Sequence, residues 1–379
     1  MKILIAGDYC PKERVAKKIE EGDYESILGD VKKETDGADY AIVNLECPVV
    51  EHEASPIDKC GPNLKCSPKA VEALKWAGFN CVTLANNHFL DFGETGVSDT
   101  LRTCRSKGLD VVGGGNNALE ASKILFKDIK GKKLAIINCC EHEFSIATDN
   151  TAGSNPLNIV QQYYDIQEAR KIADYIIVII HGGVELFWLP SKRMIETYRF
   201  FVDAGADAVV NHHQHCYSGY EVYKGKPIFY GLGNFCFDGN PYDYRWTSGF
   251  MVNINFADCN IVTFDVLPYR QCDKEVCVRH LNEKEKDEFL GKISDYNRLI
   301  KDDIQRELLY LKWCQSKEGM YKSVLNPVSN RYTEWFFKTR IGDRLLTKRK
   351  LLQIYDYLVN ESHVERIRLL YNSKINKYK

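Results

Sequence analysis

The sequence predicts a layered α/β fold, because short apolar runs alternate with segments of helical period along most of its 379 residues. These runs are rich in β-branched residues and contain no charged side chain, as is typical of strands buried on both faces. They occupy residues 3–6, 40–43, 81–85, 134–137, 175–180, 208–210 and 228–232. Strands that alternate with helices in this way favour sheets covered by helices.

Two of the intervening segments carry clear helix boundaries. Ser67 and Pro68 precede residues 69–77, and Gly78 follows them, which is the order of an N-cap, a proline in the first turn and a stop. Residues 191–205 repeat the pattern of a serine start and a glycine end. One face of that predicted helix carries Met194, Tyr198, Phe201 and Val202.

The pattern of predicted elements changes after residue 248. Residues 249–256 and 261–267 are expected to be two antiparallel strands that close a sheet. From about residue 280 the chain becomes helical and highly charged. We therefore predict two regions, a catalytic-type α/β domain over 1–279 and a helical, basic C-terminal appendage over 280–379.

Composition excludes several classes of protein. The formal net charge is -1, so no overall positive field indicates a nucleic-acid partner. The 14 cysteines form no regular pairs of the disulfide-scaffold kind, and no apolar run is long enough to span a membrane. These features predict a cytoplasmic protein with free thiols.

Polar side chains follow nearly every predicted strand. Asp8 follows the first, and Asn44 and Glu46 follow the second. The later strand ends carry Asn86-Asn87-His88, His181 with Glu185, Asn211-His212-His213-Gln214-His215, and Asn234. Each alone is explained as a cap, a turn dipeptide or a surface loop. Because ligands bind beyond the carboxyl ends of strands in α/β sheets, the recurrence predicts one shared site.

The side chains at these ends define the chemistry of that site. Carboxylates, an amide oxygen and imidazoles suit manganese, iron or zinc better than calcium or copper. No thiolate cluster of the structural zinc type is present in the sequence. Two divalent ions sharing one carboxylate would suit phosphoryl transfer.

Taken together and in this order, these motifs resemble the poly-gamma-glutamate capsule-biosynthesis (CapA) family. The strongest are Asn86-Asn87-His88 followed by Asp91 and Gly93, and the Gly231-Leu232-Gly233-Asn234-Phe235 string. That family is similar in fold to calcineurin-like metallophosphoesterases. The resemblance covers about residues 1–270 and implies a four-layer α/β/β/α sandwich with a dinuclear metal centre.

The resemblance also implies a role for each matching residue. Implied metal ligands are Asp8 and His215 at the first metal, Asn87, His181 and His213 at the second, and Glu46 as the bridge. His88 would either protonate the leaving group or steady the phosphate, and Asn87 and Asp91 would share in catalysis. Asn86, Glu185 and Asn234 are expected to contact substrate, with Asn86 and Asp91 also orienting their neighbours. Glu185 is equally well explained as a helix cap, and the alternative for Asn234 is to hold its loop.

Two departures from the phosphoesterase pattern leave alternatives open. The usual Asp-x-His opening is Asp8-Tyr9-Cys10 here, so one imidazole is missing from the first site. Cys10 either replaces it or, as is more common for a buried cysteine, packs in the core. The bridging group is Glu46 where an aspartate is usual.

Several other residues have a structural explanation beside the functional one. Glu141, His142 and Glu143 follow the fourth strand, where a solvated loop is favoured over a pocket wall. His212 is expected to face away from the site. His363 has no companion in the sequence and is expected to be structural or exposed.

The C-terminal region is strongly basic, with 12 Lys and Arg against 5 Asp and Glu over residues 331–379. Its basic residues include Arg340, Arg344, Lys348, Arg349 and Lys350, interleaved with Leu345, Leu346, Leu351, Leu352, Ile354 and Tyr355. Packing of the apolar side on the catalytic domain is the favoured explanation. The alternative is peripheral contact with an anionic polymer or the inner face of the membrane.

Three functions remain open at this point. The first is a metal-dependent phosphoesterase that hydrolyses a phosphomonoester or phosphodiester, either a small molecule or a polymer-linked substrate, in capsule or surface-polysaccharide biosynthesis. The second is a non-catalytic or weakly catalytic assembly protein that binds an anionic polymer. The third is a metal-dependent amide hydrolase acting on a glutamyl polymer, since the same activated water could attack a carbonyl.

Overall fold

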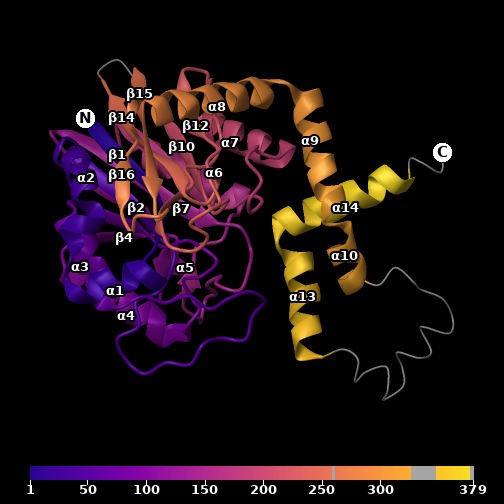
Figure 1. Ribbon diagram of the computed structural model, residues 1–379, viewed down its shortest axis with the longest axis horizontal. Helices are drawn as coiled ribbons and strands as arrows, with labels where there is room; N and C mark the ends of the chain where they lie inside the picture. Colours follow the sequence, from indigo (N-terminus) through magenta and orange to yellow (C-terminus); the bar gives the residue numbers. More distant parts are fainter. Residues whose placement is uncertain (258–260, 326–346, 376–379) are drawn as a thin grey trace.

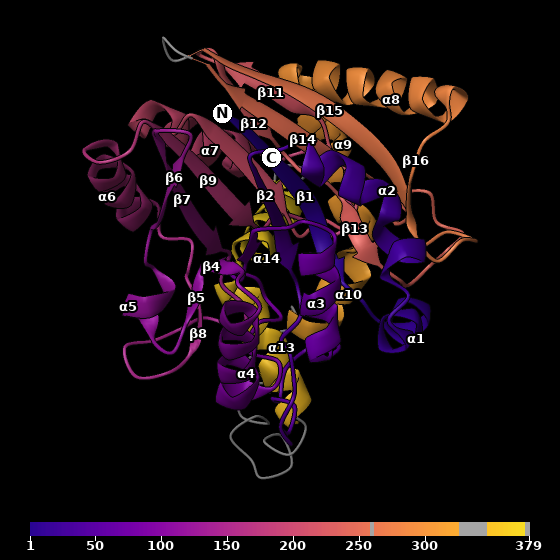
Figure 2. The ribbon, with the colours of Figure 1, turned by 90° about the vertical axis from the view of Figure 1, so that its left-hand side faces the viewer.

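The computed structural model describes residues 1–257, 261–325 and 347–375. Two mixed β-sheets form the centre of the molecule (Figures 1 and 2). The first sheet contains β1 (Lys2–Cys10), β2 (Tyr40–Leu45), β3 (Cys81–Thr83), β4 (Asp110–Val112), β13 (Asn234–Phe237), β14 (Ser248–Phe256), β15 (Val262–Gln271) and β16 (Val278–His280). Its order is β16-β15-β14-β1-β2-β3-β4, and β13 also pairs with β1.

The second sheet contains β6 (Leu125–Ile129), β7 (Lys132–Cys140), β9 (Tyr175–His181), β10 (Ala208–His212), β11 (Tyr220–Tyr223) and β12 (Lys226–Phe229). Its order is β11-β12-β10-β9-β7-β6. A separate two-stranded ribbon joins β5 (Gly114–Gly115) and β8 (Gly153–Ser154). The central pairs β1–β2, β2–β3, β7–β9 and β9–β10 are parallel, so their carboxyl ends point the same way within each sheet.

Helices cover the outer face of each sheet. The helices of the α/β body are α1 (Glu13–Glu21), α2 (Tyr24–Asp36), α3 (Pro68–Trp76), α4 (Gly93–Ser106), α5 (Ala118–Ala121), α6 (Ile159–Arg170) and α7 (Lys192–Ala204). The C-terminal helices are α8 (Glu283–Lys301), α9 (Asp303–Ser316), α10 (Glu318–Leu325), α13 (Lys348–Val359) and α14 (Glu361–Ile375). The starts of α3 and α7 after Ser67 and Ser191 confirm the two helices predicted from their caps.

Alternating side chains of the strands build three apolar layers. Leu4 and Ala6 of β1 pack outward against α1–α4, whereas Ile3 and Ile5 point inward to the second sheet. The inward face of the second sheet meets them, and its outward face packs on α6 and α7. Since successive side chains of a strand point to opposite faces, runs without polar residues are what a sheet buried on both sides requires. The layers therefore follow the order helix, sheet, sheet, helix.

The predicted antiparallel pair at the end of the α/β body is confirmed as β14 and β15. The prediction for the seventh strand is wrong in one respect. Asn234 was placed at its end, but β12 ends at Phe229 and Asn234 begins a new strand, β13, in the other sheet. The glycines at 231 and 233 lie in the crossing segment, and Gly233 has a positive φ of 80° that favours glycine.

The C-terminal helices pack on the α/β body rather than standing apart from it. Phe289 and Ile293 of α8 enter the layer between the sheets, and Tyr310 of α9 and Leu370 of α14 join the layer on the second sheet. Figure 1 shows α9, α10, α13 and α14 grouped at one side of the body.

A polar network also ties α14 to the body. Arg193 of α7 contacts Glu141 at 2.6 Å and Glu365 at 3.3 Å, and Ser362 donates to Glu141 at 2.7 Å. His142 completes it with a 2.6 Å contact to Glu361. The expectation of a solvated loop over residues 141–143 is therefore wrong, since the C-terminal helices cover it.

The basic C-terminal region can be followed in part. Arg340, Arg344, Leu345 and Leu346 lie outside the described residues. Lys348 and Arg349 are exposed at the start of α13, and Lys348 forms an ion pair with Asp58. Ile354 packs on the core of the second sheet, whereas Leu351 and Tyr355 stay exposed. Within the described ranges, no helix has both the length and the apolar character needed to cross a membrane.

Replacing Arg193 by methionine is expected to destabilise the protein by roughly 3 kcal/mol, because two largely buried carboxylates lose their cation. Urea denaturation followed by circular dichroism measures this change. Lys192→Met is the matched control, since its side chain is exposed and pairs with the equally exposed Glu196. Equal stability of the two variants would show that the network does not hold α14 in place.

Candidate metal centre

The predicted strand-end side chains meet where the carboxyl ends of both sheets come together. Asp8 lies in β1, Glu46 directly follows β2, and His181 ends β9. His213 and His215 follow β10. All five side chains are almost completely buried. Two groups of potential ligands form among them, and both contain Glu46.

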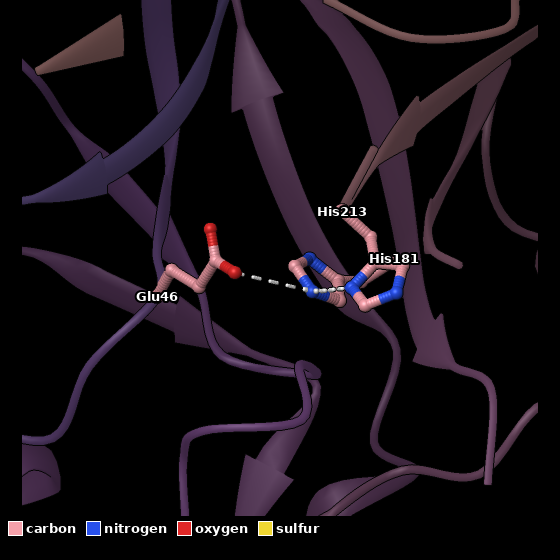
Figure 3. A group of neighbouring side chains, drawn as sticks. All are labelled: Glu46, His181 and His213. Carbon is pink, nitrogen blue, oxygen red and sulfur yellow. Dashed lines mark hydrogen bonds and ion pairs between the residues drawn. The ribbon is translucent and has the colours of Figure 1, made fainter. Parts of the chain in front are cut away.

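The first group contains Glu46, His181 and His213 (Figure 3). His181 Nε2 lies 3.7 Å from Glu46 Oε1 and 3.1 Å from His213 Nδ1. Asn87 Oδ1 is 3.1 Å from the same His181 nitrogen. On its other side, His181 Nδ1 faces the Asn44 amide at 3.3 Å, so this amide orients the ring.

The second group contains Asp8, Glu46 and His215. His215 Nε2 lies 3.5 Å from Glu46 Oε1, and His215 Nδ1 lies 3.9 Å from Asp8 Oδ2. Asn234 Oδ1 is 3.0 Å from that same Nδ1, so it orients the imidazole toward Glu46. Asn44 donates to Asp8 Oδ1 at 2.8 Å.

These groups fit divalent ions by spacing. Ligand atoms about 2.1 Å from one ion lie roughly 3.0–3.5 Å from one another in tetrahedral or octahedral geometry. The donor separations of 3.1, 3.5 and 3.7 Å around Glu46 and the histidines are close to that range. The groups could therefore hold metal ions, with Glu46 placed to serve both.

The Glu46 carboxylate gives an independent reason for the same conclusion. It is 0% exposed, and neither of its oxygens has a hydrogen-bond donor among the described residues. Burial and the nearby Asp8 charge raise the pKa of Glu46 well above its ordinary value. An uncompensated buried carboxylate is costly, and cations bound beside it would remove that cost.

His181 is in the protonation state that binds metal. Burial and the neighbouring His213 lower the pKa of His181 well below its ordinary value, so its ring is neutral near pH 7. Neutral imidazole is the form that binds metal. For Asp8, the effect of the surrounding imidazoles, led by His212, outweighs burial and lowers its pKa.

The backbone at this site is strained at His213 and His215, and this conformation directs their side chains toward the other potential ligands. His213 has a φ of 90° and His215 a φ of 54°, values that residues other than glycine rarely adopt. The β1 pairing also shifts register next to Asp8. Such irregularities redirect side chains at the ends of strands. Gly7 is needed here because a Cβ would lie 2.0 Å from Gly233 O.

His88 lies beside the ligands with two charged neighbours. Its Nδ1 is 2.7 Å from Asp91 Oδ2 and 3.0 Å from Lys59 Nζ, and Lys59 and Asp91 form an ion pair. Burial outweighs the Asp91 contact and lowers the pKa of His88 to about 4, so the ring is neutral when the cavity holds no ligand.

A cavity of about 400 Å³ opens over this centre. From the α/β body it is lined by Lys59, Asn87, His88, Glu143, Glu185 and His213, and from the C-terminal helices by Trp313, Lys317, Asp356, Asn360, His363 and Arg366. Its volume is in the range of small-molecule sites. A larger cavity of about 540 Å³, between α7 and α14, holds none of the predicted site residues.

The residues expected to contact substrate are placed differently from one another. Glu185 lines the cavity. Asn86 and Asn234 are completely buried: Asn86 accepts from the His88 amide at 3.0 Å, and Asn234 contacts His215. Both are therefore placed to hold the site loops.

Three other expectations are settled by these contacts. His212 does not face away from the site, because its Nδ1 lies 3.3 Å from Asp8 Oδ1. His363 has companions, since Tyr321 and Asp356 contact it in the cavity wall. Cys10 packs in the core beneath the first sheet.

Sequence reasoning gave Asn44 no role beyond its place at a strand end, and it missed Lys59 and Arg366 as members of the site. Asn44 had a signal, since it stands at a strand end beside Glu46. Lys59 lies in a long loop without period, and Arg366 lies more than 270 residues beyond His88 in an apparently separate region. No local pattern identifies either of them.

Comparison with known proteins shows that the chain is similar to bacterial capsule synthesis proteins. The family model described as bacterial capsule synthesis protein PGA_cap matches residues 2–239. The capsule biosynthesis protein CapA of Bacillus anthracis is 31% identical over 279 residues, covering 71% of this chain and 67% of that protein. The PGA biosynthesis protein CapA of Bacillus subtilis is 34% identical over 235 residues, covering 61% of this chain and 62% of that protein. Among solved structures, a 5'-nucleotidase precursor from Thermus thermophilus aligns with a TM-score of 0.45 and 11% identity, over 79% of this chain and 59% of that one.

Glu46→Gln is expected to have opposite effects without and with metal. In the metal-free protein this substitution should raise the free energy of unfolding. The pKa of Glu46 is raised in the folded protein, so the wild type loses stability as pH rises above 4.5, the ordinary pKa of glutamate, whereas the neutral glutamine does not. With Mn²⁺ at about 100 times its Kd, the wild type should gain about 2.7 kcal/mol, and the variant should gain little. Thermal unfolding in EDTA and in MnCl₂ measures both effects.

The matched control is His52→Gln. His52 belongs to another cluster, with Glu51 and Asp99, but that cluster is partly exposed. Its replacement should leave the Mn²⁺ stabilisation unchanged. If Glu46→Gln keeps the full Mn²⁺ effect, the ions bind elsewhere.

Proposed function

Because the chain belongs to the bacterial capsule synthesis protein family PGA_cap, we propose that it is a metal-dependent phosphoesterase of capsule or surface-polysaccharide biosynthesis. The single observation that carries the proposal is the pair of ligand groups sharing Glu46. Two metal ions bridged by one carboxylate are the arrangement used for in-line phosphoryl transfer. The four-layer order of the sheets and helices agrees with a calcineurin-like metallophosphoesterase fold.

Six residues would hold two divalent ions, of manganese, iron or zinc. Asp8 and His215 would bind the first, and Asn87, His181 and His213 the second, with Glu46 between them. Bound there, the ions would supply an activated water nucleophile and stabilise charge on the phosphoryl oxygens. Asn44, His212 and Asn234 would hold Asp8, His181 and His215 in place.

The chain's own acid would be His88. With its Nδ1–H donating to Asp91, the other ring nitrogen of His88 is left for the leaving oxygen. A phosphate dianion in the cavity would favour the protonated ring, offsetting the burial that lowers its pKa. Lys59 would contribute positive charge beside the phosphoryl group, since its ammonium lies within 3.0 Å of the His88 ring.

One observation favours a second candidate, a non-catalytic component that binds an anionic polymer. The ligand group of Asp8, Glu46 and His215 has only these three members among the described residues, because Cys10 occupies the position of the usual histidine and packs in the core. Under this alternative, loss of His213 would not change polymer binding. Neutralising Lys348, Arg349 and Lys350 would weaken it.

His213→Ala is expected to remove metal-dependent turnover, because it removes one proposed metal ligand, which the strained loop backbone holds in place. The test is metal content of the purified protein together with Mn²⁺-dependent hydrolysis of a panel of chromogenic phosphoesters. We expect about two ions per wild-type chain. His52→Ala is the control. Turnover that survives in the Asn87→Ala, His213→Ala double variant would show that the site is misassigned.

His88→Asn is expected to lower kcat by about 10²–10⁴, the usual contribution of a general acid, without changing metal content. Esters with poor leaving groups should suffer most, since they depend most on protonation. The measurement is kcat for a series of aryl phosphates of different leaving-group pKa. An equal loss for all members would argue that His88 binds phosphate rather than donating a proton.

A further inference from the structure

The C-terminal helices form one wall of the catalytic cavity. Trp313 of α9, Asp356 of α13 and His363 and Arg366 of α14 line it, with Lys317 just after α9. The opposite wall carries the ligands Asn87 and His213 and the acid His88. A substrate whose phosphoryl group lies at the ligands would therefore place its remaining part against this C-terminal wall.

Arg366 is the unusual residue of that wall. Its side chain is only 8% exposed. Its Nε donates to Ser362 O, a carbonyl of its own helix, at 2.9 Å, and its guanidinium lies 5.6 Å from the Trp313 ring and 5.8 Å from the Tyr321 ring. Across the described ranges it forms no ion pair, and no hydrogen bond of its two terminal nitrogens is found.

Other buried arginines of the chain behave differently. Arg306, 2% exposed, pairs with Asp303 at 2.7 Å, and Arg270, 9% exposed, approaches Glu285 at 3.6 Å. A buried arginine without a carboxylate is costly, because its lost hydration is not replaced. Asp356 is near enough for Arg366 to affect its pKa, yet its carboxylate is directed to His363 Nε2, 3.4 Å away.

A second cation strengthens the positive character of this wall. Lys317 Nζ lies 5.6 Å from the centre of the same Trp313 ring and has no ion pair in the described part of the chain. Two cations thus share one aromatic ring at the cavity, and neither forms an ion pair with a carboxylate of the described residues, although the charge of Arg366 reaches Glu185 and Asp356. An arginine with free terminal nitrogens presents the planar fork that matches carboxylate and phosphate.

We propose that Arg366, with Lys317 and Trp313, forms an anion subsite opposite the metal ligands. It would recognise a carboxylate or second phosphate on the part of the substrate that is not transferred. The inference rests on the proposed phosphoesterase function and narrows its substrate class to esters that carry a second anionic group. Arg366 is then a specificity residue.

The first experiment compares phenyl phosphate, 4-carboxyphenyl phosphate and benzene-1,4-diyl bis(phosphate) with the full chain and Mn²⁺. The wild type should show a KM about 10- to 100-fold lower for the doubly anionic esters, the effect of a charge-assisted hydrogen bond. Arg366→Gln should abolish this preference, so that the three esters show similar KM values. The two anionic esters separate carboxylate from phosphate recognition.

Arg368→Gln is the matched control. Arg368 lies on the same helix two residues later, is exposed, and lines the other cavity, so its loss changes charge equally without touching this site. Lys317→Gln should weaken the preference partially. Because Lys317 is exposed, this variant should fold normally, and it tests the subsite even if the Arg366 variant misfolds. An unchanged preference in Arg366→Gln, or no preference in the wild type, would overturn the subsite.

A binding measurement separates this proposal from the proposed reaction. Phenylphosphonate and 4-carboxyphenylphosphonate are not hydrolysed, so calorimetry measures their Kd whether or not the protein is an enzyme. Tighter binding of the carboxylated compound that is lost in Arg366→Gln would support the subsite even if no ester is turned over. Equal binding by wild type and variant would overturn it even if phosphoesters are hydrolysed.

Discussion

The buried, unpartnered carboxylate of Glu46 is the constraint on which the rest of the site depends. Its oxygens find no donor among the described residues; the imidazoles of His181 and His215 lie 3.7 and 3.5 Å away, and the like-charged Asp8 lies nearby. A fold that keeps such a group at 0% exposure loses stability there. The strained backbone of His213 and His215 adds to that cost. Divalent ions bound at these groups would explain both features, because the free energy of metal binding would offset the stability lost in the metal-free protein.

The layered fold is what allows ligands so distant in sequence to meet. Asp8 and Glu46 come from the first sheet, whereas His181, His213 and His215 come from the second. Their strands face one another across a shared apolar layer, so the carboxyl ends of both sheets border the same space. Crossing of the chain back to the first sheet at β13 then brings Asn234 behind His215. Asn44 contacts both Asp8 and His181, and so couples the two sheets at the site.

What could be predicted from the sequence was decided by local pattern. The strand runs and the polar residues after them are local features, and the six predicted ligands do meet. The exchange of sheets at Asn234 could not be predicted, because a glycine-rich crossing and a simple strand end have the same composition. His212 was misplaced because strand alternation was extended past the point where the backbone of His213 turns to a positive φ. Glu141 was judged exposed because its partners, Arg193 and Ser362, lie 52 and 221 residues away.

The C-terminal helices show why a region can look like an appendage in sequence and still belong to the site. Packing on the catalytic domain was the favoured explanation for their apolar side, but no role in the site was predicted. In the structure, α14 directs Ser362 and Glu365 to the body and Arg366 to the cavity. One helix thus carries both the contacts that hold it and the charge that lines the cavity wall. The proposed metal ligands lie at strand ends of the two sheets. The opposite wall is built from helices whose side chains can differ without disturbing a ligand. Under the proposed function, choice of substrate would therefore lie in α9, α13 and α14, and the chemistry would lie with the two sheets.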